Sequence, residues 1–174
     1  MIEKEPFVGA RSMSTTFKTR VLSAVFHVCI AMLWYDRANA VEEEYRPDWA
    51  AVKPVRSLTL LASPNESATQ NGERLRKRIE QLAPGDLLEI GTGTYSVERL
   101  WDLAISGTKD APIWIVASND TKVVLTRPDA KQNVLNVGQS NPVQYLAIQG
   151  LEITGGSHGI RLGKCQDVWI DRCH

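Results

Sequence analysis

The sequence predicts an all-β fold in which short strands stack in successive coils, a three-faced parallel β-helix. One short pattern occurs twice near the end of the chain: Leu146-x-Ile148-x-Gly150-Leu151 and Val168-x-Ile170-x-Arg172-Cys173. The two copies are offset by 22 residues, and the alternation of apolar side chains breaks at the same place in each copy. A repeat of this length with strand-like alternation is typical of a solenoid to which each copy adds one coil.

The segments with period-two alternation sort into three series, which predicts three strands in each coil. The first series is Leu88/Ile90, Ile113/Ile115, Leu146/Ile148 and Val168/Ile170. The second is Val123/Leu125 and Leu151/Ile153, and the third is Leu103/Ile105, Leu135/Val137 and Ile160/Leu162. The segment from Gly91 to Tyr95 is expected to be a turn. A β-sandwich is the competing all-β interpretation, but the one Asn-Gly pair, Asn71-Gly72, does not lie between strands as a hairpin turn would.

An amphipathic helix is predicted just before the first coil. Its apolar stripe consists of Leu75, Ile79 and Leu82. These side chains fall at helical spacing and can cover the exposed end of the stack, which would otherwise be open to aggregation. Thr69 or Asn71 is expected to cap the helix, and Ala83-Pro84-Gly85-Asp86 is expected to end it. We therefore assign residues 71–85 to a capping helix and residues 86–174 to the first coils.

The N-terminal region has the pattern of an export signal. Residues 1–40 combine basic residues, an apolar run from Val21 to Tyr35 and the cleavage triplet Ala38-Asn39-Ala40, with Met13 as an alternative start. A membrane anchor is disfavoured because the run is short and contains His27. Residues 41–70 are expected to be a linker and lead-in. The predicted location is secreted, periplasmic or at the cell surface.

Composition suits one soluble domain with extra segments, since 43% of the 174 residues are hydrophobic and 23% are charged. The formal net charge is zero, and no basic stripe indicates a nucleic acid partner. Cys29 falls within the predicted signal. Cys165 and Cys173 could form a disulfide, although Cys173 takes the place of Leu151 in the repeat and is therefore expected to be a small core residue.

Several turn and core motifs resemble the opening coils of the pectate-lyase-like superfamily of right-handed parallel β-helices. They are Leu82-Ala83-Pro84-Gly85-Asp86, Gly93-Thr94-Tyr95, Ser106-Gly107-Thr108, Gly150-Leu151-Glu152-Ile153-Thr154-Gly155-Gly156 and Gly159-Ile160-Arg161-Leu162. Within the superfamily, the chain is similar to alginate lyases, chondroitinase B-type lyases and mannuronan epimerases. The resemblance covers residues 75–174 and implies only the N-terminal part of such a protein, truncated within a coil.

The resemblance implies processing of an acidic polysaccharide by proton abstraction next to a uronate carboxylate, with Ca²⁺ or a basic side chain stabilising the anion. The residues that do this chemistry in the family lie on later coils, so no catalytic residue is assigned here. No metal site is evident in the sequence, because Asp167 and Asp171 are too few ligands for Ca²⁺. Ca²⁺ remains an expectation for a complete parent protein.

Four residues are candidates for binding a polysaccharide: Trp114, Trp169, Arg161 and Arg172. Trp114 and Trp169 lie between inward positions of equivalent strands, so both are expected to point outward on one face and to stack on sugar rings. The alternative for both is contact with an N-terminal segment or a neighbouring loop. Arg161 and Arg172 could pair with carboxylates, although outward charges are also the ordinary surface of a solenoid.

The sequence thus predicts the N-terminal part of an exported, monomeric lyase or epimerase that acts on an acidic polysaccharide. Two alternatives stay open. One is a non-catalytic cell-surface module that binds glycans or acts as an adhesin, and the other is a truncated fragment without activity.

Overall fold

The computed structural model describes residues 46–118 and 121–174, and the predicted signal peptide lies outside them. Residues 47–174 form one compact unit, to which the following description applies. Its elements are, in order, η1 (Asp48–Ala51), β1 (Arg56–Leu60), α2 (Ala68–Ile79), β2 (Asp86–Ile90), β3 (Gly93–Ser96), β4 (Asp102–Leu103), β5 (Ile113–Ala117), β6 (Val123–Arg127), β7 (Leu135–Val137), β8 (Val143–Gln149), β9 (Glu152–Gly155), β10 (Ile160–Leu162) and β11 (Cys165–Asp171).

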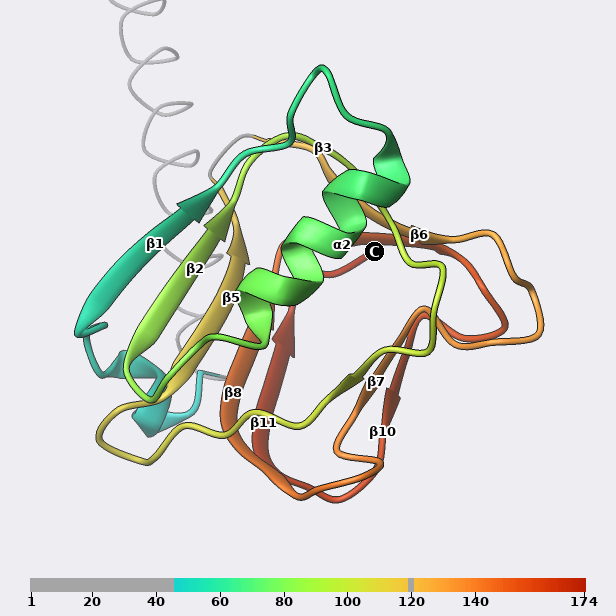
Figure 1. Cartoon of the computed structure of the whole chain (residues 1–174). Helices are drawn as coiled ribbons and strands as arrows, with labels where there is room; N and C mark the ends of the chain where they lie inside the picture. The colour runs from blue at the N-terminus through green and yellow to red at the C-terminus, as the bar shows by residue number, and fades with distance from the viewer. Residues whose placement is uncertain (1–45, 119–120) are drawn as a thin grey trace, which may run out of the picture. The chain divides into compact units, whose positions relative to one another are not determined.

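The described chain is mostly β, and its strands form three sheets that surround one core (Figure 1). Sheet 1 has the order β1-β2-β5-β8-β11, sheet 2 the order β3-β6-β9 and sheet 3 the order β4-β7-β10. Every pair of neighbouring strands in these sheets is parallel. Successive strands enter sheets 1, 2 and 3 in turn, which is compatible with a parallel β-helix.

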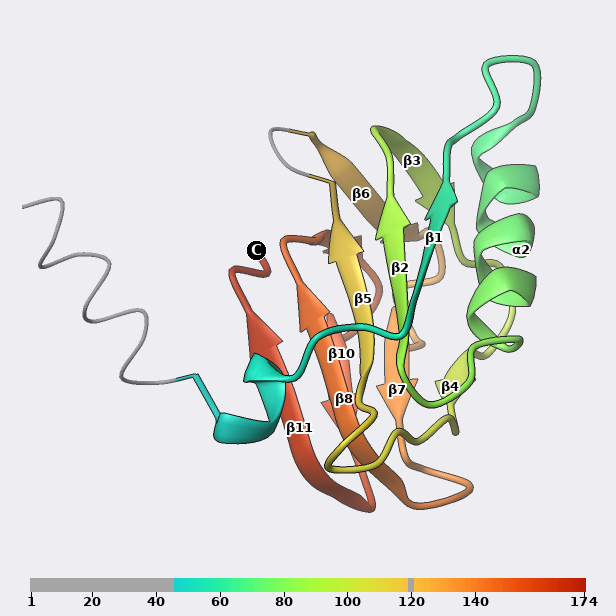
Figure 2. The ribbon, with the colours of Figure 1, turned by 90° about the vertical axis from the view of Figure 1, so that its left-hand side faces the viewer.

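We call each such round a layer. The first layer contains β2, β3 and β4, the second β5, β6 and β7, and the third β8, β9 and β10, while β11 opens a fourth. Figure 2 shows the strands of sheet 1 side by side, with α2 at the end of the stack that carries β1. Strand β1 enters sheet 1 ahead of the first layer, and it lies within residues 41–70, which the sequence assigned to a linker and lead-in.

The register between neighbouring strands confirms the 22-residue repeat. Leu146 pairs with Val168 and Ile148 with Ile170, as the repeated pattern predicts. Ile113 and Ile115 likewise pair with Leu146 and Ile148. In the other sheets the predicted equivalence of Leu125 with Ile153 and of Ile160 with Leu135 is also found.

Two predicted registers are wrong by two residues. Leu88 pairs with Ile115 rather than with Ile113, and Leu103 pairs with Val137 rather than with Leu135. A shift of two residues keeps the same side chains on the same face, so alternation cannot distinguish one register from the other.

The segment predicted as a turn from Gly91 to Tyr95 contains strand β3, which pairs with β6. Its Tyr95 is fully buried in the core, and the hydroxyl donates to the carbonyl of Gly91 at 2.9 Å. Burial raises the pKa of this phenol above its ordinary value. The strand was not predicted because glycine is a usual residue of turns and the segment lacks a run of apolar residues.

Helix α2 (Ala68–Ile79) lies where a helix was predicted, but it begins and ends earlier than the predicted residues 71–85 and is capped by a different residue. The cap is Ser67 and not Thr69 or Asn71, and Ser67 forms a reciprocal capping box with Gln70. The predicted stripe is confirmed for Leu75 and Ile79, and Leu82 also belongs to the main core although it lies beyond the end of the helix. The helix lies against β3, the first strand of sheet 2.

Candidate functional site

The outer face of sheet 1 carries a row of apolar residues that lie next to one another on successive strands. The row consists of Leu87, Trp114, Ala147 and Trp169, from β2, β5, β8 and β11. It belongs to a second apolar cluster that is separate from the main core. The sequence therefore assigned Trp114 and Trp169 to the same outer face correctly.

The sequence predicted that Trp114 would be open to solvent, but the residue is buried. A covering segment, residues 47–52 with η1 at its centre, places Trp49 and Ala50 on the row. Trp114 retains 5% exposure, Trp49 retains 6%, and the Trp49 ring meets the ring of Tyr145 edge-on at 5.9 Å. The alternative interpretation, contact with an N-terminal segment, therefore describes Trp114. The signal in the sequence was Trp49 itself, an aromatic residue within a presumed linker.

Trp169 lies at the other end of the row, on β11, and is only partly buried. Two side-chain pairs flank it along β8 and β11. Gln144 donates to Gln166 at 3.1 Å, and Gln149 donates to Asp171 at 3.1 Å. Trp169 is thus the part of the aromatic row that remains accessible.

The two candidate arginines lie elsewhere. Arg172 follows β11, has a left-handed backbone with φ of 49°, and its Nε lies 3.0 Å from the carboxylate of Asp171. Arg161 lies on β10 in sheet 3, beside Asn136. The structure therefore brings Trp114 and Trp169 together but does not bring Arg161 to the same face. The role of all four residues in binding stays a prediction.

Sheet 3 presents a polar network around Asn136, which is almost fully buried. The Asn136 amide donates to the carbonyl of Trp101 at 3.3 Å and accepts from Asn133 at 2.7 Å. Asn133 in turn contacts Ser157 and Nδ1 of His158, each at 3.0 Å. His158 is exposed on this turn, and the network joins the second layer to the third.

Asp102 provides a similar link between layers. Its carboxylate accepts hydrogen bonds from the backbone of Gln139 and from the backbone and hydroxyl of Ser140. Burial would raise the pKa of Asp102, but these hydrogen bonds outweigh it, and the pKa lies below its ordinary value. Arg127 has the same structural role, because its buried guanidinium donates to the carbonyls of Arg99 and Asn133, both at 3.1 Å.

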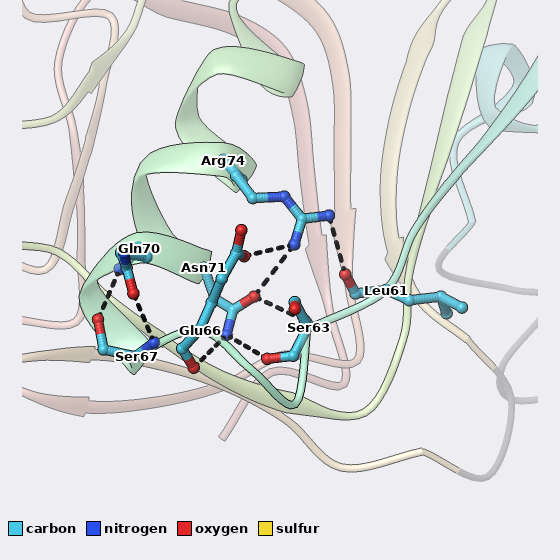
Figure 3. A network of polar contacts seen from close by, with 7 residues as sticks. All are labelled: Leu61, Ser63, Glu66, Ser67, Gln70, Asn71 and Arg74. Carbon is cyan, nitrogen blue, oxygen red and sulfur yellow. Dashed lines mark hydrogen bonds and ion pairs between the residues drawn. The ribbon is translucent and has the colours of Figure 1, made fainter.

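The largest polar cluster near α2 anchors the loop before the helix (Figure 3). Asn71, which is 4% exposed, accepts from the backbone of Ser63 and donates to the carbonyls of Ser63 and Glu66. Arg74 binds the carboxylate of Glu66 at 2.7 Å and the carbonyl of Leu61 at 3.3 Å. The polar groups of this cluster bind one another, so its role is to hold the loop before the helix in place.

The motif Pro84-Gly85-Asp86 has a clear structural role. The buried carboxylate of Asp86 accepts two hydrogen bonds from Arg56 of β1, at 2.8 and 2.6 Å, and one from the backbone of Ala83 at 2.7 Å. Gly85 has a φ of 90°, where a side chain would meet Val55. The motif thus joins the end of the helix region to the first strand of sheet 1.

Neither cysteine forms a disulfide: Cys165 and Cys173 are both free, at opposite ends of β11. Cys173 packs on the main core as the repeat predicts, and burial raises the pKa of its thiol. Within residues 46–118 and 121–174, no three His, Cys, Asp or Glu side chains form a group that could hold a metal ion. In the same ranges, no helix is long and apolar enough to cross a membrane.

Comparison with known protein families, with curated proteins and with solved structures finds no match for this chain. The parallel sheets are compatible with the superfamily suggested by the sequence motifs, but no relative supports that assignment.

Proposed function

We propose that the chain is the N-terminal part of an exported right-handed parallel β-helix of the pectate-lyase-like type. The supporting observation is the regular entry of strands into three parallel sheets, in the order that the sequence motifs imply. Right-handed crossovers are strongly preferred between parallel strands of one sheet. Helix α2 acts as the cap of this stack, since it lies against the first strand of sheet 2 and contributes Leu75 and Ile79 to the core.

The bonding at the open end supports further layers. The backbone of Ile153 donates to the carbonyl of His174 at 2.7 Å, and His174 donates to Leu151 at 3.0 Å. His174 thus pairs with the backbone on either side of Glu152 in β9, which supports the proposal that a further strand of sheet 2 follows. Ile153, Ile160 and Val168 of the last strands are only partly buried, which an added layer would change.

The proposed activity is cleavage or epimerisation of an acidic polysaccharide in the extracellular space or periplasm, by residues on later layers. Ca²⁺ is a candidate cofactor of such a complete protein. The second candidate is a non-catalytic glycan-binding module of the cell surface, which the aromatic row on sheet 1 favours.

The test begins with the genomic sequence after codon 174. Further coils with acidic and basic residues clustered on one face support the enzyme, while many regular coils without such a cluster support the binding module. The protein with those coils is then assayed on alginate and polygalacturonate for the ultraviolet absorbance of unsaturated uronates and for epimerised residues. Neither product from purified, folded protein would reject the enzyme. N-terminal sequencing of exported protein, with Val41 first, tests the signal peptide.

A further inference from the structure

Strand β1 leaves one edge of sheet 1 open. It forms the end of that sheet and pairs only with β2 among the residues that the structure describes (Figure 2). The backbone N–H of Arg56 and the carbonyl of Leu60 bond to the residues that flank β2, so the even-numbered residues of β1 face β2. Ser57 and Thr59 therefore direct their backbone N–H and C=O groups to the open side. Such an edge is a template for a further strand.

The most exposed large apolar side chains of the described residues stand at the two ends of this edge. Val55, just before β1, is 80% exposed, and Leu61, just after it, is 64% exposed. Both lie on the same face, because odd-numbered residues of a strand share one face. The N–H of Val55 donates to Gly85 at 2.8 Å, and the carbonyl of Leu61 accepts from Arg74 at 3.3 Å (Figure 3). Both ends of the edge are thus held in place before any partner binds.

The edge is complementary to itself in one antiparallel register. A two-fold axis through Leu58 places Ser57 opposite Thr59 of the partner subunit, and these residues then exchange both of their backbone hydrogen bonds. The same axis places Val55 opposite Leu61 of the partner subunit, so each exposed apolar side chain meets another. It also brings together the two copies of Leu58, whose side chain is only partly buried in one chain.

Other registers lack this match. An axis one residue along β1 in either direction keeps the backbone bonding but separates Val55 from Leu61 of the partner subunit. An axis between two residues would oppose an outward-directed backbone group to an inward-directed one. In the register about Leu58, the one charged residue of β1, Arg56, is opposite the apolar Leu60 of the partner subunit, so no like charges face each other.

We propose that the open edge of β1 is a dimer interface that takes β1 of a second copy of this chain in the antiparallel register about Leu58. Backbone hydrogen bonds attach the two strands, and the contacts between Val55 and Leu61 of the partner subunit select the register. Two short strands form a small interface, so we expect a Kd of about 10–100 μM. The monomer that the sequence predicts is then the state at low concentration. The interface does not depend on the glycan chemistry of the proposed function.

Sedimentation velocity of the full chain, from well below to well above this Kd, tests the interface. We expect a reversible equilibrium between monomer and dimer. Val55→Lys and Leu61→Glu should each weaken the dimer by about tenfold or more, because each places a charge against an apolar side chain. The double variant should recover most of this loss, since the axis then places every lysine opposite a glutamate. The two positions lie at opposite ends of β1, so this recovery requires pairing between copies.

A backbone variant tests the strand pairing itself. Thr59→Pro removes an N–H that points to the open side and not to β2, so it should abolish the dimer and keep the fold. Thr59→Val keeps that N–H and is the matched control, which should dimerise like the unsubstituted chain. Leu162→Lys, at an exposed apolar side chain of β10 in sheet 3, should also leave the dimer unchanged. Circular dichroism of each variant checks that a loss of dimer is not a loss of fold.

Three results would overturn the interface. The first is a chain that stays monomeric well above the expected Kd. The second is association that Val55→Lys and Leu61→Glu do not weaken, or that the double variant does not recover. The third is growth into assemblies larger than a dimer, which would indicate pairing of β1 with a different strand of the next copy. None of these results bears on polysaccharide cleavage or binding, so the proposed function stands or fails separately.

Discussion

Gly150 and Arg172 occupy the same backbone position in successive layers, although one has no side chain and the other has a long one. Both are left-handed, with φ of 72° and 49°. The preceding pair, Tyr145 and Asp167, is also offset by 22 residues and has φ of 51° and 53°. Residues with side chains adopt this region uncommonly. The repeat is therefore a repeat of backbone conformation, even where the residue types differ.

The two positions should respond oppositely to substitution. Gly150→Ala places a Cβ about 3.2 Å from Ala117 in a left-handed conformation, so we expect a loss of about 1–2 kcal/mol in the free energy of unfolding. Arg172→Gly removes the same conformational strain, and the ion pair with Asp171 that it gives up is exposed and therefore weak, so stability should be unchanged or up to about 1 kcal/mol higher. Urea unfolding of both variants checks this, and equal losses would contradict it.

Asp86 makes the stability of the fold depend on pH. Hydrogen bonds from Arg56 lower the pKa of Asp86 more than burial raises it, so its folded-state pKa lies below the unfolded one. Its stabilising contribution is complete above the unfolded pKa of about 4 and is lost as the pH falls through the lower folded value. Stability should therefore decrease on acidification below about pH 4.

Asp86→Asn should cost about 2 kcal/mol at neutral pH, because two charge-assisted hydrogen bonds are weakened. It should also make the decrease in acid shallower. The control is Glu89→Gln on the same strand, which should stay within about 0.5 kcal/mol of the unsubstituted chain. Urea unfolding at a series of pH values measures both effects, and an unchanged acid dependence in Asp86→Asn would show that other carboxylates cause it.

At the scale of elements, the helix shows what the sequence could and could not predict. The spacing of Leu75, Ile79 and Leu82 predicted the buried face correctly, because periodicity reports which side chains share a side. The predicted N-cap was wrong because several polar residues lie near the start of the helix, and each of them could act as the cap. Asn71 instead fixes the loop through Ser63 and Glu66, contacts that depend on how that loop folds back.

Ser67→Ala should therefore destabilise the chain by about 1 kcal/mol, since it removes the acceptor for the backbone of Gln70. Thr69→Ala, at one of the two positions that the sequence offered as a cap, leaves the capping box intact and should change stability by less than about 0.5 kcal/mol. Thermal melts followed by circular dichroism compare the two. A larger loss in Thr69→Ala would place the helix start where the sequence first suggested.

The candidate site was predictable only in part. Alternation assigned Trp114 and Trp169 to one face, because the side-chain period of a strand is two. It could not show that Trp49, from a segment with no periodicity, would return to cover Trp114. Arg161 was a separate candidate, expected to face outward and to pair with carboxylates. It lies on sheet 3 and not on the face of the two tryptophans, because successive strands enter different sheets.

At the scale of the whole molecule, the two ends of the stack differ. The first layer is covered by α2 and β1, whereas core side chains of the last strands are partly buried. Ile148 and Ile170 are in register one layer apart, and only Ile148 is completely buried. The stack is therefore expected to be least stable at β9, β10 and β11.

This difference can be measured with a matched pair. Ile148→Ala should cost about 3–4 kcal/mol because it leaves a cavity in a closed layer. Ile170→Ala should cost about 1 kcal/mol because less apolar area is lost from an open layer. Equal costs in urea unfolding would mean that β11 is as well packed as the interior. If the genomic sequence supplies further layers, the cost at Ile170 should rise toward that at Ile148.

The matching left-handed positions on β8 and β11 have a consequence for engineering. Left-handed residues recur 22 positions apart, so each 22-residue unit contains the backbone conformations that turn the chain from one sheet toward the next. We therefore expect that an in-frame duplication of residues 150–171 would add one layer to the stack without disrupting the layers already present. The 22-residue unit can therefore serve as a building block for longer proteins of this fold.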